Sequence, residues 1–73
     1  MSATASAIRI SLNGEERRVP DGVSVANLLE QIGLDRRKVA VERNEAIVPR
    51  STYGETMLGE GDKLEIVHFI GGG

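Results

Sequence analysis

The residues best placed for chemistry are the three glycines that close the sequence, Gly71, Gly72 and Gly73. They follow Phe69 and Ile70 with no polar spacer. Glycine has no Cβ and adopts backbone conformations that other residues avoid, so a partner enzyme could close around the bare backbone. A glycine run is also typical of a linker. The direct junction with the preceding apolar run favours a recognised tail whose reactive group is the carboxylate of Gly73.

The side chains are poor in internal catalysts. The sequence has no cysteine, which excludes a thiolate nucleophile, a disulfide and a cysteine-based zinc site. His68 is the only histidine, and no serine or carboxylate stands at a spacing that would make it a base. The carboxylates show no metal-ligand spacing. We therefore expect a protein that is not an enzyme, that binds no metal or cofactor, and that other proteins modify.

Size and charge narrow the function classes further. A chain of 73 residues forms one domain, and its net charge is −2. The single basic run, residues 36–38, is typical of a solvated loop between a helix and a strand. With Tyr53 and Phe69 as the only aromatic residues, nucleic-acid binding is disfavoured. No apolar run approaches the roughly 20 residues of a membrane span, and the first six residues do not resemble a signal peptide. A cytoplasmic protein is expected.

The first half of the sequence predicts a hairpin and then a helix. Residues 8–12 alternate apolar and polar, as in a half-buried strand. Asn13-Gly14 favours a tight turn into a second, edge-like strand over 15–19. Ser24 is a candidate helix N-cap, and apolar residues then recur at helical spacing over 25–32. Gly33 is placed to end this helix.

The second half predicts three more strands. Residues 39–43 and 46–48 form a short hairpin around Asn44-Glu45, and Pro49 stops the pairing. Residues 50–58 are expected to be irregular, with a short helical turn near 53–58, and the last strand covers 63–70. One helix covers only one face of a small mixed sheet, so the fold class is α+β, a β-grasp of four to five strands with the first and last strands adjacent. We expect a flexible segment over 1–6, the domain over 7–70 and a flexible tail over 71–73.

Side-chain alternation along the last strand predicts which residues face outwards. Leu64 and Ile66 are expected on the buried side, which leaves Val67 and Phe69 on the outer face beside the tail. Two exposed apolar residues near a functional terminus can form a docking patch. We therefore predict that Val67 and Phe69 contact the partner.

Three segments resemble the ThiS family, the ubiquitin-like β-grasp sulfur carriers of thiamine biosynthesis. They are residues 44–50 (NEAIVPR), residues 61–67 (GDKLEIV) and the closing glycines. The family pattern ends in two glycines, matched here by Gly72 and Gly73, and Gly71 is an additional one. The resemblance extends over nearly the whole chain from about Ile8. The block over 47–50 distinguishes this family from other β-grasp carriers.

The resemblance implies a carrier that is activated by other proteins. An E1-like adenylyltransferase would use ATP to adenylate the carboxylate of Gly73. A donor that carries sulfur as a persulfide would convert the adenylate to a thiocarboxylate, and thiazole synthase would receive the sulfur. The carrier itself would be a monomer without a bound cofactor. Three alternatives remain open: the small subunit of molybdopterin synthase, a ubiquitin-like protein modifier, and a non-catalytic β-grasp interaction module.

Overall fold

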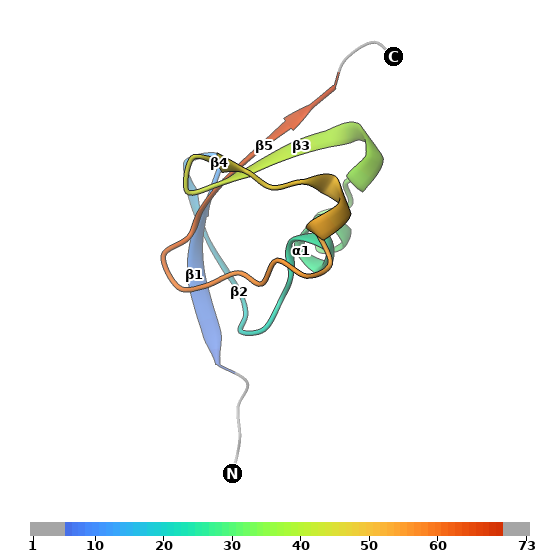
Figure 1. Cartoon of the computed structure of the whole chain (residues 1–73). Helices are drawn as coiled ribbons and strands as arrows, with labels where there is room; N and C mark the ends of the chain where they lie inside the picture. Colours follow the sequence, from blue (N-terminus) through green and yellow to red (C-terminus); the bar gives the residue numbers. More distant parts are fainter. Residues whose placement is uncertain (1–5, 70–73) are drawn as a thin grey trace.

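Two alternating apolar runs from opposite ends of the chain form adjacent strands in the centre of the sheet. The computed structural model describes residues 6–69 (Figure 1). Its sheet has the order β2-β1-β5-β3-β4, in which β1 and β5 are parallel and the other pairs are antiparallel. The strands are β1 (Ala7–Leu12), β2 (Glu15–Pro20), β3 (Val39–Arg43), β4 (Ala46–Ile47) and β5 (Lys63–His68). This arrangement confirms the predicted mixed β-grasp sheet.

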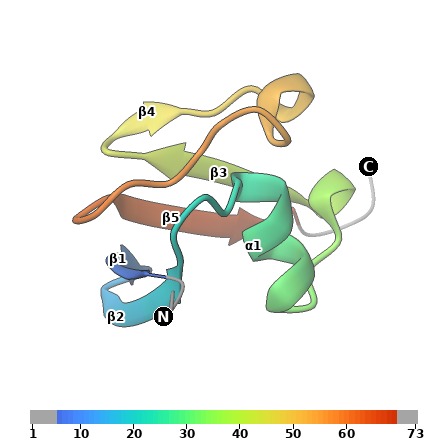
Figure 2. The same ribbon diagram turned by 90° about the horizontal axis from the view of Figure 1, so that it is seen from below.

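One helix covers one face of this sheet (Figure 2). Helix α1 (Val25–Gln31) begins at Ser24, whose hydroxyl accepts a hydrogen bond from Asn27 N–H (3.1 Å), while the Asn27 side chain accepts one from Ser24 N–H (3.3 Å). Gly33 follows the helix in the left-handed region (φ 79°), which favours glycine. The predicted helix is therefore confirmed to within one residue. Among the described residues, no helix has the length and apolar character needed to cross a membrane.

The two hairpins turn on residues in the left-handed region. Asn13 and Gly14 have φ values of 51° and 86°, and Asn44 and Glu45 have values of 53° and 72°. Positive φ at both central residues is the geometry that matches the twist of a two-residue hairpin. Asparagine tolerates this conformation better than most residues because its short polar side chain can bond locally. Both hairpins were predicted from these residues.

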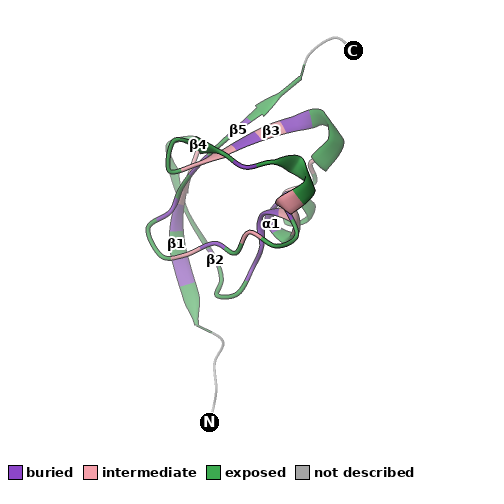
Figure 3. Ribbon diagram, viewed as in Figure 1, coloured by how far each residue is buried: buried purple, intermediate pink, exposed green. Residues whose placement is uncertain are grey.

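The core lies between α1 and the inner face of the sheet (Figure 3). The inward residues of the strands alternate with exposed ones, and Leu64 in β5 is fully buried. Fourteen apolar side chains form the core cluster: Ile8, Ile10, Val19, Val23, Val25, Leu28, Leu29, Val39, Val41, Val48, Tyr53, Leu58, Leu64 and Ile66.

The segment between β4 and β5 differs from the prediction. The expected helical turn near residues 53–58 lies earlier, as the 3₁₀ helix η2 (Arg50–Thr52), directly after Pro49. Proline fixes φ near the value that the first residue of a turn needs, which favours the earlier start. Tyr53 follows as a buried residue, and its hydroxyl donates a hydrogen bond to the Val39 carbonyl (3.3 Å). This segment therefore closes the open side of the core.

The last strand is shorter than predicted within the described residues. Strand β5 ends at His68, although Phe69 N–H still donates a hydrogen bond to the Lys38 carbonyl (2.9 Å). At the other end, the Ser6 carbonyl accepts a hydrogen bond from Asp21 N–H (2.9 Å), and the flexible segment expected over 1–6 stays a prediction. Ile70 and the glycines over 71–73 lie outside the described residues, as do residues 1–5.

Candidate functional site

The strand that leads to the glycines is held along both of its edges. Strand β5 lies between β1 and β3, and Val39 to Arg43 of β3 are in register with His68 to Leu64. On the other edge, β1 pairs only with the first two residues of β5, Lys63 and Leu64. Beyond Leu64, this edge of β5 is bonded by a side chain.

That contact is the carboxamide of Asn13, which continues the pairing beyond the end of β1. Asn13 Oδ1 accepts a hydrogen bond from Ile66 N–H (2.8 Å), and Asn13 Nδ2 donates one to the Ile66 carbonyl (3.3 Å). The backbone N–H of Asn13 also donates to the Leu64 carbonyl (2.9 Å). The turn residue thus bonds to β5 as a strand residue would.

A second turn asparagine fixes the start of β5. Asn44 N–H donates to the Lys63 carbonyl (2.8 Å), and Asn44 Oδ1 accepts from Lys63 N–H (2.9 Å). The Asn44 amide also donates to Asp62 Oδ1 (3.1 Å). The hairpin between β3 and β4 is thereby joined to the residue that precedes β5.

Asp62 is the one acidic residue that is buried in the described part of the chain. Its Oδ2 accepts hydrogen bonds from Arg43 Nε and from Gly59 N–H, both at 2.8 Å. Burial acts to raise the pKa of Asp62, but the bonds from Arg43, Gly59 and Asn44 stabilise the carboxylate and together hold this pKa below its usual value. The carboxylate therefore stays ionised and ties the 59–62 loop to β3.

Asp62→Asn should lower the free energy of unfolding by about 1.5–3 kcal/mol at pH 7, because hydrogen bonds to a charged group are lost. The pKa of Asp62 is lowered on folding, so its stabilising effect is fully present above the pKa of an unfolded aspartate, about 3.9. The effect is lost as the pH falls from there through the folded value. Urea unfolding at several pH values should show the parent and the variant converging in acid.

Glu15→Gln is the matched control for this measurement. It also removes one negative charge, but Glu15 is exposed on the edge strand β2, where substitutions usually change stability by less than about 0.5 kcal/mol. Equal losses in the two variants, or a loss in Asp62→Asn that does not change with pH, would contradict the assigned role of the carboxylate.

Val67 and Phe69 lie on the surface, as the alternation predicted. Their exposed fractions are 62% and 55%, while Leu64 and Ile66 are buried. Residues paired directly across two strands lie on the same face of a sheet. Ala40 is paired with Val67 and therefore lies on the outer face. Ile47, which is 66% exposed, lies on that face too, because it is paired with Glu42, which is paired with Glu65. We define Ala40, Ile47, Val67 and Phe69 as the apolar patch.

Arg50 is a neighbour of this patch that the sequence reasoning missed. Its guanidinium carbon lies 5.7 Å from the centroid of the Phe69 ring, within the range of a cation–π interaction. In the sequence, the block over 47–50 indicates only a family pattern. Its position beside Phe69 depends on the pairing of β4 with β3 and of β3 with β5, which brings these distant parts of the sequence together.

His68 lies exposed at the end of β5, opposite Val39. Among residues 6–69, no hydrogen bond or ion pair joins its side chain to another group. The predicted tail residues, Gly71, Gly72 and Gly73, lie outside the described residues, so their roles stay predictions. What the structure places together is the base of the tail, formed by β5, the apolar patch and Arg50.

Similarity to known proteins gives this arrangement a family. The ThiS family model matches residues 7–73. The sulfur carrier protein ThiS of Bacillus subtilis is 38% identical over 65 residues, which cover 88% of this chain and 98% of that protein. The crystal structure of the thiamine biosynthesis protein ThiS from Geobacter metallireducens superposes with a TM-score of 0.78 at 28% identity, covering 90% of this chain and 100% of the other.

A longer relative contains a region similar to this chain. The thiazole synthase of Paramagnetospirillum magneticum is 53% identical over 66 residues, which are 90% of this chain. The chain spans only 20% of the length of that protein, and the same share of the thiazole synthase of Magnetococcus marinus. With the family model matched from β1 through residue 73, and a β-grasp sheet shared with a solved relative, the chain belongs to the ThiS family.

Proposed function

We propose that this chain is a sulfur carrier that supplies sulfur for thiazole formation in thiamine biosynthesis. The observation that carries the proposal is the family match, which runs through residue 73 and thus includes the three glycines. The carboxylate of Gly73 would be the group that is modified, and residues 71–73 the segment that partner enzymes recognise. The chain would act as a co-substrate and not as an enzyme.

The chemistry requires three steps at the carboxylate of Gly73. A free carboxylate resists nucleophiles, so one of its oxygens first attacks the α-phosphorus of ATP and pyrophosphate leaves. The sulfur of a persulfide then attacks the acyl carbon of this adenylate and displaces AMP, and a thiol cleaves the resulting disulfide to leave the thiocarboxylate. Water must be kept from the activated acyl group, so the tail must be enclosed. A segment without side chains enters a narrow slot most easily.

Three partners follow from these steps. An E1-like adenylyltransferase would bind the ATP, a persulfide-bearing protein would donate the sulfur, and thiazole synthase would receive it. A monomeric carrier suits this sequence of encounters, because the same tail must reach each partner in turn. The proposed compartment is the cytoplasm, where ATP and these donors would meet.

The longer relatives support the pairing with thiazole synthase. Proteins of that name contain a region 50–53% identical to this chain. Joining two binding modules in one polypeptide raises their effective concentration, up to about the millimolar range for short flexible linkers. Such a gain is useful where a carrier and an acceptor bind each other weakly, which is what a carrier that exchanges partners requires.

An intact-mass measurement tests the function. The chain is incubated with its adenylyltransferase, ATP and a sulfur donor, and the expected gain equals the exchange of one oxygen for sulfur. Deletion of Gly73 should abolish the gain. Conjugates of higher mass would instead indicate a protein modifier. If the mass did not change under any condition, only the non-catalytic interaction module would remain as an explanation. Binding to molybdopterin synthase in place of thiazole synthase would indicate the small subunit of molybdopterin synthase.

Phe69→Asp should weaken binding to the adenylyltransferase by about 2 kcal/mol, as for an aromatic anchor of an interface, or roughly 30-fold. The free energy of unfolding should change by less than about 0.5 kcal/mol, because Phe69 is exposed. Titration calorimetry measures the first quantity and urea unfolding the second.

Met57→Asp is the matched control. Met57 is a similarly exposed apolar residue (51%), but it bridges to Ser24 at the start of α1 and lies outside the apolar patch. Equally weakened binding in the two variants would contradict docking through the apolar patch, and a large loss of stability in Phe69→Asp would show that Phe69 belongs to the core.

A further inference from the structure

The short 3₁₀ helix η1 (Arg36–Lys38) lies directly beside the point where β5 ends. The Lys38 carbonyl accepts the hydrogen bond from Phe69 N–H (2.9 Å), and Val39 is paired with His68. Figure 1 shows the same proximity, with the segment before β3 next to the far end of β5. The basic run that the sequence suggested to be an ordinary loop therefore stands at the base of the tail.

Arg50 brings a further positive charge to the same place. It extends from η2 and lies against the Phe69 ring, on the residue whose N–H is bonded to Lys38. Arg36, Lys38 and Arg50 are all exposed. We define these three residues as the basic rim of the tail.

The basic residues at the two ends of β5 differ in their pairing. At the start of β5, Arg43 bonds Asp62 at 2.8 Å and Lys63 lies 3.8 Å from Glu65. Arg9, nearby on β1, lies 3.6 Å from Glu16 and 3.8 Å from Glu60. At the tail end, within residues 6–69, no carboxylate lies within 4.0 Å of the Arg36, Lys38 or Arg50 side chain. The positive charge of the basic rim is thus not neutralised by a direct ion pair within this part of the chain.

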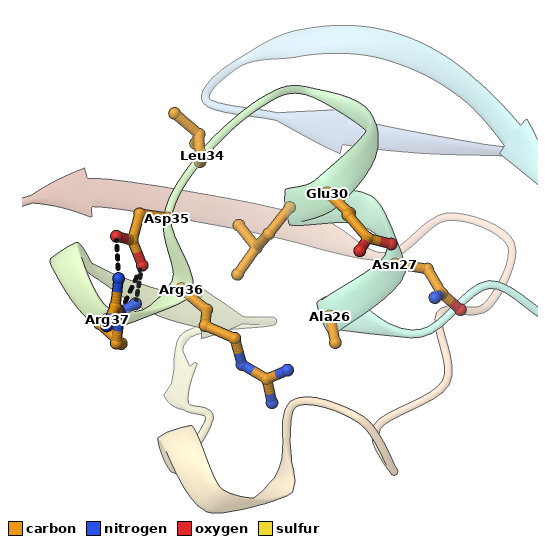
Figure 4. A pocket seen from close by; sticks show the side chains of 8 residues that line it. Ala26, Asn27, Glu30, Leu34, Asp35, Arg36 and Arg37 are labelled. Carbon is orange, nitrogen blue, oxygen red and sulfur yellow. Dashed lines mark hydrogen bonds and ion pairs between the residues drawn. The ribbon is translucent and has the colours of Figure 1, made fainter.

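Arg37, between two members of the rim, behaves differently. Asp35 Oδ1 accepts from Arg37 N–H and Nε, and Asp35 Oδ2 accepts from the terminal guanidinium nitrogen at 3.0 Å. The hydrogen bonds from Arg37, with a smaller contribution from the nearby charge of Lys38, lower the pKa of Asp35 to about 2, so the carboxylate stays ionised and offsets most directly the charge of Arg37. Figure 4 shows Arg36 directed away from this pair, into the hollow between α1 and η1.

We propose that the basic rim is an electrostatic docking surface for carboxylates on the adenylyltransferase, outside the slot that takes the glycines. This inference rests on the proposed function. The chain carries a net charge of −2, so a positive region confined to the tail end gives it a charge asymmetry. An acidic region beside the slot would orient the encounter so that the tail arrives first, because complementary potentials steer association.

Steering suits a carrier with a small contact surface. The apolar patch includes only four residues, and ordering each tail residue opposes binding. Long-range attraction raises the rate of productive encounter without making the complex slow to dissociate, since charges at the rim of an interface act mainly on the association rate. A carrier that must leave one enzyme for the next needs that combination.

The test compares two double charge reversals of equal size. Arg36→Glu/Lys38→Glu replaces two positive charges of the basic rim with two negative ones. Arg17→Glu/Arg18→Glu makes the same change in net charge on β2. These residues pair with Ile10 and Arg9 of β1, beside the start of β5 and away from its tail end. Pyrophosphate release by the adenylyltransferase gives kcat and KM for each variant, and stopped-flow association gives the on-rate. All are measured at low and at high salt.

For Arg36→Glu/Lys38→Glu we expect kcat/KM and the on-rate to fall about tenfold or more at low salt. The loss should lie in KM, with kcat at saturating carrier unchanged. It should shrink at high salt, because the screening length falls from about 10 Å at 0.1 M to about 3 Å at 1 M. Arg17→Glu/Arg18→Glu should stay close to the parent, and Arg36→Gln/Lys38→Gln should lose less than the charge reversal.

Four outcomes would overturn the inference. Equal losses in the two reversals would show an effect of net charge alone. A loss that salt does not reduce would show a structural defect, and no loss would show that the rim is not a contact. Salt-sensitive binding of the rim to a single-stranded oligonucleotide, with adenylation unchanged, would assign it to nucleic acid. By contrast, a parent chain that is bound but not adenylated would refute the proposed function first.

Discussion

Gly72→Val is expected to unfold with the free energy of the parent and yet to be adenylated at least about a hundredfold more slowly, the effect of misplacing a reacting group by about 1 Å. The valine adds a branched side chain to the segment that the proposed slot must enclose. Within the described residues, the buried core ends at Ile66, six positions before the substitution. Pyrophosphate release and urea unfolding measure the two quantities.

Gly54→Val is the matched control for this variant. A Cβ at Gly54 meets no heavy atom within 4 Å, and the residue has no positive φ, so the same substitution is accommodated at a surface turn. It should be adenylated at the rate of the parent. If Gly72→Val were charged as fast as Gly54→Val, the enzyme would not close on a side-chain-free segment, and the proposed role of the three glycines would fail.

Leu64→Ala should lower the free energy of unfolding by about 2–5 kcal/mol, through lost burial and the cavity that remains. Leu64 is fully buried in the central strand. The loss is large for a small domain, because the total stability of such proteins is only about 5–15 kcal/mol. Urea unfolding of the purified chain, with the slope held constant between variants, gives the difference.

Val67→Ala tests the same strand from its other face. Val67 is 62% exposed, so its truncation should change stability by less than about 0.5 kcal/mol. Similar losses in the two variants would contradict the assignment of inner and outer faces along β5. The docking prediction for Val67 and Phe69 would then lose its structural basis.

The local features of the fold could be predicted from the sequence. Asn13-Gly14, Ser24 and Gly33 each act on the residues beside them, through left-handed backbone or a capping bond. The faces of β5 follow from strict alternation. Together with the family resemblance, these patterns were sufficient for the β-grasp topology, in which β1 and β5 are neighbours.

The features that were missed depend on contacts between distant residues. Tyr53 packs in the core and its buried hydroxyl donates to the Val39 carbonyl, and nothing in its neighbourhood in the sequence indicates that bond. Asp62 resembles an ordinary loop aspartate until Arg43 and Asn44 are brought to it by the β3–β4 turn. The proximity of Lys38 to Phe69 likewise requires the pairing of β3 with β5. Only the assembled sheet shows that the basic run stands at the base of the tail.

The central position of β5 determines how the protein responds to tension. A strand at the edge of a sheet is paired on one side only, so a force on its end can break its hydrogen bonds one after another. Strand β5 is gripped by β3 along one side and by β1 and Asn13 along the other. A force on the residues that follow β5 would therefore have to break the bonds on both edges of the strand at once, which opposes local unfolding from this end more than pairing on one edge would.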